Sequence, residues 1–179
     1  GIRITNCFLR ALTSNIAQKW FSNNFDTTKL ETGAGMFYSN NNKILFFGCK
    51  SDNSIFEKYG TVFVRSYSLT GVFENEVTLP QIEGSPTIIK KTISTPDGGF
   101  LLVGSNGQLP SNDLVSPNKI ILIKLNSDLT VSWTQALNTF FPGRGFDVTY
   151  LNDGTLGLVG FLKENYSVNK VMYIHLDAN

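Results

Sequence analysis

The feature that most constrains this chain is an apolar run ending in glycine that recurs at a fixed interval. The glycines are Gly48, Gly104 and Gly160, so the two successive intervals are both 56 residues long. A period of this length indicates a tandem array in which one structural unit is used several times. Each run follows a short turn, and the three copies read Asn41–Gly48, Asp97–Gly104 and Asp153–Gly160.

Further patterns keep the same order within each unit. A second apolar strand ends in a polar turn and occurs four times, at 7–12, 62–67, 120–125 and 171–176. A third strand follows at once and carries Trp20, Asn75 or Trp133, and one more extended stretch precedes each glycine run, at 35–38, 91–94 and 147–150. Each complete unit therefore holds four strands of about five residues, the usual strand length in globular proteins.

Four short strands per unit predict an all-β chain built from tandem four-stranded antiparallel units of about 56 residues. The turn before each glycine run contains Asp-Gly or Asn-Asn, which tolerate positive φ and favour an antiparallel hairpin. Units of this kind are typical of β-propeller blades. We expect a single array over residues 1–179, with a partial blade at 7–24, blades at 35–80 and 88–138, and a partial blade at 145–177.

About three blades fall short of the four to eight that propellers usually have. A closed ring would then need either the remainder of a longer chain or a second copy in a homo-oligomer. The alternative is a β-trefoil-like fold, which also uses three copies of a four-stranded unit.

The units resemble the propeller-like repeats of bacterial secreted and surface proteins, in which an Asp-Gly-Gly turn and a following glycine precede a Leu-x-Ser-x-Gly-x-x-x-Trp segment. The resemblance covers about 7–177, and it departs from the pattern at Asn41–Lys43, Asp153–Thr155 and Asn75. It implies an extracytoplasmic location, whether secreted, periplasmic or at the cell surface. It implies no fixed activity, because such repeats are an architecture that carries many functions.

Composition narrows the choice of partner. Fifteen basic and fourteen acidic residues give a net charge of +1, so no long-range field attracts nucleic acid. No stretch approaches the roughly 18 apolar residues needed to span a bilayer. We expect a protein or glycan ligand.

The two cysteines, Cys7 and Cys49, lie in or just after apolar runs without the spacing of a metal site. They are interpreted as unpaired structural residues. A disulfide between them and a lipid-modified Cys7, as in a lipoprotein, are the alternatives.

The sequence contains few residues that could support catalysis or bind a cofactor. His175 is the single histidine, so neither a histidine-based triad nor a zinc hydrolase centre is expected, and we predict a non-enzyme without metal or cofactor. Asp97 and Asp153 supply one carboxylate per turn, too few for calcium. Arg10 and Arg65 share one strand position, where we expect their stems to pack between blades and their heads to reach backbone carbonyls; paired ligand contacts are the alternative.

The candidate site lies in the longer connections, which we expect on one face of the array, where binding residues usually occur. It combines aromatic surface with hydrogen-bonding groups, as a carbohydrate or peptide site does. Its residues are Phe140, Phe141, Arg144, Asp147, Lys163 and Tyr166, with Glu164 and Asn165 beside them. In the competing interpretation, the phenylalanines pack between blades and the charged residues form a solvated loop.

The function predicted from the sequence is a non-enzymatic β-propeller-type binding or interaction platform. One alternative is a carbohydrate-binding, lectin-like module. Another is a segment of a propeller hydrolase or lyase whose catalytic residues lie elsewhere.

Overall fold

A computed structural model describes residues 9–12, 18–22, 29–39, 41–51, 60–107, 119–137, 139, 142–163 and 169–177, with backbone alone for 9–22 and 169. The described chain is all-β, as the sequence predicted, and its thirteen strands pair antiparallel throughout. Within these residues no helix is long and apolar enough to cross a membrane.

The strands form a hairpin and three larger sheets in which sequence neighbours pair. The hairpin consists of β1 (Leu9–Leu12) and β2 (Gln18–Ser22). The first sheet holds β3 (Leu30–Ser39), β4 (Lys43–Ser51), β5 (Thr61–Ser68) and β6 (Phe73–Thr78). The second holds β7 (Thr87–Ser94), β8 (Phe100–Asn106), β9 (Lys119–Leu125) and β10 (Val131–Leu137). The third holds β11 (Gly143–Tyr150), β12 (Leu156–Lys163) and β13 (Asn169–Leu176).

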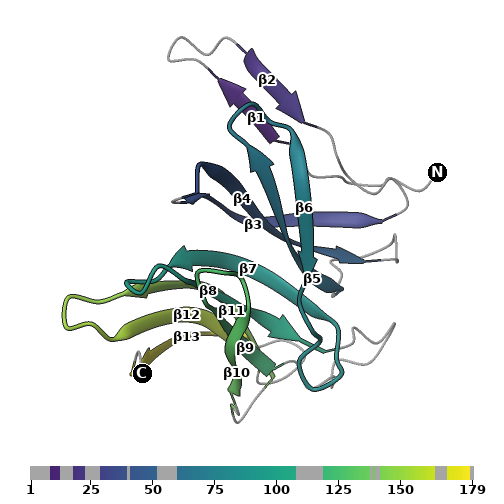
Figure 1. The fold of residues 1–179 in the computed structure, drawn as a ribbon. Coiled ribbons are helices and arrows are strands. Elements are labelled where there is room, and N and C mark those ends of the chain that lie inside the picture. Colours follow the sequence, from purple (N-terminus) through teal and green to yellow (C-terminus); the bar gives the residue numbers. More distant parts are fainter. Residues whose placement is uncertain are drawn as a thin grey trace.

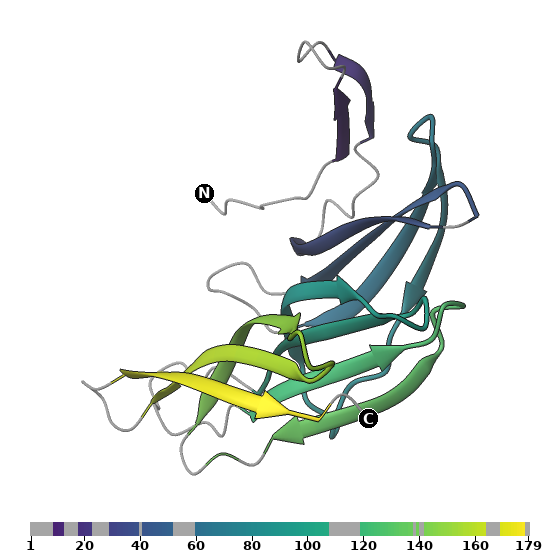
Figure 2. The same ribbon diagram turned by 90° about the vertical axis from the view of Figure 1, so that its left-hand side faces the viewer.

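The three larger sheets stack face to face in sequence order (Figures 1 and 2). The first strand of each sheet packs across the sheet before it: β7 lies against β3, β4 and β5, and β11 lies against β7, β8 and β9. Among the described residues the first and third sheets share no extensive contact, so the stack is open.

The turn between the first two strands of each sheet has the same conformation in all three. Asn42, Gly98 and Gly154 adopt positive φ angles of 56°, 80° and 84°. Each donates its backbone N–H to the carbonyl three residues earlier, at 3.2, 2.9 and 3.0 Å. The positive φ expected from the Asn-Asn and Asp-Gly sequences is therefore confirmed.

A β-bulge in the first strand explains the recurring glycine. The register shifts at residues 34, 90 and 146, opposite Gly48, Gly104 and Gly160. The bulge brings a first-strand carbonyl close to each glycine, so that a Cβ added there would lie 2.5, 1.9 and 2.2 Å from the oxygens at residues 32, 88 and 144. A side chain at these positions would require the bulge to move.

The apolar core lies between the sheets. One cluster joins residues of the first sheet, such as Phe47 and Val64, to Ile89 and Leu102 of the second. Another joins Val103 of the second sheet to Leu158 of the third. Each sheet therefore has two faces. The leading face is the one that, in the second and third sheets, turns toward the sheet before it in the chain. The trailing face is the one that, in the first and second sheets, turns toward the sheet after it.

The leading face of the first sheet contains a buried ion network. Arg65 on β5 donates to both oxygens of Glu31 at 2.9 and 2.5 Å, and its Nε donates to Glu76 at 2.7 Å. Arg65 and Glu31 are almost fully buried, and Lys50 also pairs with Glu76. The expectation that the Arg65 head meets backbone carbonyls is wrong, because β3 and β6 place two carboxylates beside it; the side chain of Arg10 lies outside the described residues.

Replacing Gly104 by alanine tests the bulge. We expect Gly104→Ala to lower the free energy of unfolding by roughly 2–3 kcal/mol, because the new Cβ cannot fit beside the Ile88 carbonyl. Urea denaturation measures the change. Thr134→Ala, at an exposed position of β10, is the control and should shift stability by less than about 0.5 kcal/mol; equal losses in the two variants would contradict this role of the glycine.

A second test concerns the buried pair. Arg65→Ala leaves the Glu31 carboxylate buried without its main partner and should cost roughly 3–5 kcal/mol in urea denaturation. The double variant Arg65→Ile/Glu31→Thr copies Ile123 and Thr87, the second sheet's residues at these positions, and should recover most of the loss. A double variant as unstable as Arg65→Ala would refute the explanation by uncompensated charge.

A third test uses the acid dependence of stability. Burial alone would raise the pKa of Glu76, but hydrogen bonds from Lys50 and Arg65 outweigh it and hold the pKa below its usual value. A lowered pKa stabilises the fold above the unfolded-state pKa of about 4.3, and this stabilisation is lost as the pH falls through the folded-state pKa. Wild type should therefore exceed Glu76→Gln in stability above about pH 5, with the gap closing toward acid; a gap independent of pH would contradict the assignment.

Candidate functional site

Three of the six predicted site residues lie outside the described part of the chain: Phe140, Phe141 and Tyr166. The other three do not share a loop face as expected. Arg144 is on β11 and Lys163 ends β12, because the ladder between these strands continues past the bulge as far as Gly143. The backbone N–H of Lys163 also donates to the Pro142 carbonyl at 2.8 Å, which holds the two strand ends together.

The structure does not gather Arg144, Asp147 and Lys163 into one pocket. The Arg144 guanidinium lies 5.8 Å from the centroid of the Phe161 ring, on the adjacent strand. Asp147 lies at the free edge of the sheet, and its carboxylate is 3.4 Å from the Lys91 ammonium group on β7. Asp147 therefore joins two neighbouring sheets, while Arg144 belongs to an exposed face.

This exposed face is the trailing face of the third sheet, here called the terminal face. Side chains alternate between the two sides of a strand, so pairing partners on adjacent strands share a side. The register places Phe161 opposite Val171, and Val159 opposite Tyr173, on the side away from the core residues Leu158 and Met172. The residues of the terminal face are Arg144, Phe146, Val159, Phe161, Val171, Tyr173 and His175.

The exposure of the terminal face contrasts with the same positions in the other two sheets. Val171 is 87 % exposed, whereas its counterparts Val62 and Ile120 are 2 % and 0 % exposed. The same contrast separates Val159 and Tyr173, 43 % and 61 % exposed, from their buried counterparts Phe47, Val103, Val64 and Leu122. In the first two sheets these residues are buried by the following sheet. The terminal face therefore exposes the kind of apolar residues that the other two sheets bury at their contacts with the next sheet.

Aromatic and basic groups border this apolar surface. The Phe146 and Phe161 rings pack with their centroids 5.3 Å apart, and Arg144 lies over Phe161. His175 lies beside Thr155 and 3.8 Å from Asp153 in the turn before β12. Hydrogen bonds from Thr155, then the nearby His175, lower the pKa of Asp153, so this rim carries a carboxylate that stays ionised.

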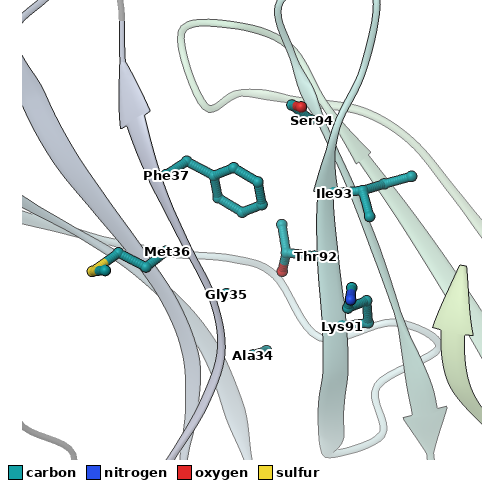
Figure 3. Close-up of a pocket in the computed structure, with 8 residues that line it drawn as sticks. All are labelled: Ala34, Gly35, Met36, Phe37, Lys91, Thr92, Ile93 and Ser94. Atoms are coloured by element: carbon teal, nitrogen blue, oxygen red, sulfur yellow. The ribbon is translucent and has the colours of Figure 1, made fainter. Parts of the chain in front are cut away.

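A shallow pocket of about 410 Å³ opens between β3 and β7 (Figure 3). Phe37 and Thr92 face each other across it, and the strands approach so closely that a Cβ on Gly35 would lie 2.9 Å from that of Thr92. Its charged group, Lys91, already pairs with Asp147. Met36 points away from β7 in this view, so the pocket offers a ligand little beyond backbone and aliphatic surface.

The described residues contain no group of three or more histidine, cysteine or acidic side chains placed to hold a metal ion. The turn carboxylate Asp97 is bound by Lys124 at 2.8 Å, and this contact, with those of Thr95 and Gly99, lowers its pKa. Cys49 is buried, and its Sγ accepts a hydrogen bond from the Ile89 amide at 3.0 Å; Cys7 lies outside the described residues.

The chain matches no protein-family model, and a search of curated proteins finds no match.

Sequence reasoning missed most of the terminal face. It assigned Val159 and Val171 to the apolar strands that recur in every unit and did not single them out as exposed. No local pattern separates these residues from their buried counterparts, because Val62, Ile120 and Val171 are all apolar and hold the same position in their units.

Proposed function

We propose that this chain is a β-propeller-type module that works as a non-enzymatic binding platform, with the terminal face as its binding surface. Each of the first two sheets has four antiparallel strands in sequence order, and each following sheet lays its first strand across the one before, an arrangement that favours propeller blades over a trefoil. A trefoil would bring its first and third units into contact, which the open stack lacks in the described residues.

The observation that carries the proposal is the exposure of apolar residues at positions that are buried in the other sheets. Fully burying an aliphatic or aromatic side chain contributes roughly 1.5–3 kcal/mol, so covering Val171 and Tyr173 together provides substantial binding energy. Contiguous exposed apolar patches of this kind mark interaction sites.

The character of the surface favours a protein partner over a glycan. Val159 and Val171 present aliphatic surface on a regular strand pair, and the guanidinium of the nearby Arg144 lies over the Phe161 ring. A sugar site needs several polar groups converging on hydroxyls, whereas a second β-sheet needs complementary apolar surface.

Binding of the labelled chain to itself and to a glycan array tests the proposal. At least one of the two should bind, and Val171→Lys/Tyr173→Asp should weaken that binding by about tenfold or more, equivalent to about 1.4 kcal/mol. Thr134→Lys, at another exposed strand position, on β10, is the control and should bind as wild type does. Failure of both arms, or binding that survives the double substitution, would refute the terminal face as a binding surface.

A further inference from the structure

We propose that β13 pairs edge to edge with β13 of a second copy of this chain, in antiparallel orientation across a two-fold axis. The site is the outer edge of the third sheet, the side of β13 that faces away from β12 (Figure 2). The inference goes beyond the proposed function, because it uses the backbone of this edge and leaves the terminal faces of both copies exposed.

A fourth strand occupies the same edge in the other two sheets. β6 pairs with β5 and β10 pairs with β9, whereas β13, the strand equivalent to β5 and β9, pairs with β12 alone among the described residues. The core-facing residues Ile174 and Leu176 of β13 are only partly buried. Their counterparts Ile123 and Leu125 are 1 % and 0 % exposed. The edge of β13 thus offers the place that a further strand takes in the other sheets.

β13 also has the composition of an inner strand. Strands at sheet edges ordinarily carry charged residues, proline or a bulge, which prevent pairing with other chains. The outer strands β6 and β10 are polar, with Glu74, Asn75 and Glu76 in one and Ser132, Thr134 and Gln135 in the other. β13 instead has an apolar run at 171–174, no proline, one lysine near its start and a regular register with β12. Its edge therefore lacks most of the features that keep an edge strand unpaired.

The backbone groups that point to the outer edge follow from the equivalent strand of the first sheet. In an antiparallel ladder, alternate residues turn both N–H and C=O toward the same neighbouring strand. The Val62 carbonyl accepts a hydrogen bond of 2.9 Å from the Leu79 amide, which directly follows β6. Val171 is the counterpart of Val62. Val171, Tyr173 and His175 therefore direct their N–H and C=O groups to the outer edge of β13.

The symmetry of these three residues about Tyr173 favours a second copy as the added strand. With Tyr173 opposite Tyr173 of the second copy, Val171 lies opposite His175, and each facing pair can exchange two hydrogen bonds. On the core side, the apolar Met172 then faces Ile174. No like charges face each other in this register, because β13 contains one lysine, one histidine and no acidic residue.

The predicted contact uses the same edge in both copies, so it closes at a dimer. Light scattering coupled to size exclusion should therefore give a mass near twice the 19.8 kDa of one chain. A monomer at every concentration up to about 1 mM would overturn the inference. A mass that keeps rising beyond the dimer would also overturn it.

Amide hydrogen exchange followed by NMR locates the contact in the wild-type chain. Exchange of the outward amides of Val171, Tyr173 and His175 should slow by about tenfold or more between dilute and concentrated solution. The amides of Met172 and Ile174, which point to β12, should exchange slowly in both. Outward amides that exchange equally fast in monomer and dimer would contradict pairing through this edge.

A matched pair of variants at Tyr173 tests the backbone contact. Tyr173→Pro removes the central outward N–H, and proline is tolerated on an edge strand where the N–H faces solvent. Tyr173→Ala keeps the N–H and is the control. The proline variant should have a dimer Kd at least about tenfold higher than the alanine variant, with circular dichroism checking that both fold. Equal values in the two folded variants would refute the contact.

Val159→Lys separates this inference from the proposed function, because Val159 is exposed on the terminal face but lies on β12, away from the edge. A dimer that survives Val159→Lys, as it should survive Thr134→Lys, supports the edge contact. If Val159→Lys is monomeric while Tyr173→Pro remains a dimer, the copies meet through their terminal faces, so the edge inference is wrong and the proposed function stands. An edge dimer in a chain that binds nothing through Val159 would confirm the inference and reject the terminal face.

Discussion

The close approach of a bulged strand to a glycine is the constraint on which the rest of this structure depends. In each of the three larger sheets the first strand carries one extra residue opposite the glycine, and its carbonyl occupies the space that a Cβ would need. A bulge increases the local twist of a strand. The first strand is also the one that lies across the preceding sheet, so the glycine allows the strand geometry through which one sheet packs on the next.

The buried ion network lies on the leading face of the first sheet, whereas the contacts between the described sheets are apolar. The interfaces between described sheets use aliphatic side chains such as Ile123 and Ile174, whereas Arg65 takes that position in the first sheet. Removing a guanidinium and a carboxylate from water is costly, and their mutual contacts offset this only when the geometry is good, as in the two-point contact with Glu31. The leading face of the first sheet is thus chemically distinct from those of the other two.

Much of the strand plan could be predicted from local sequence, and the site could not. Turn residues such as Asn42 and Gly98 report their own backbone conformation, and alternating apolar runs report strands, because both signals are local. The bulge cannot be recognised in the sequence, because the extra residue is Ala in one sheet, Lys in the next and Phe in the third. Because the sequence does not show the bulge, it predicts the strand residues before it, including Arg144, as loop. The carboxylate partners of Arg65 lie 34 and 11 residues away, and no short pattern connects them.

The open stack also shapes how stability is distributed along the chain. Each sheet gains its support from its immediate neighbours, as in solenoid repeats whose stability sums over local units and nearest-neighbour interfaces. The middle sheet is covered on both faces, while the β11–β13 sheet is covered on one. Opening of β13 should therefore require less free energy than opening of β8, whose seven residues are all buried. The free energy of opening is therefore lowest at the exposed side of the β11–β13 sheet, and a partner bound to the terminal face would raise the free energy needed to open β13.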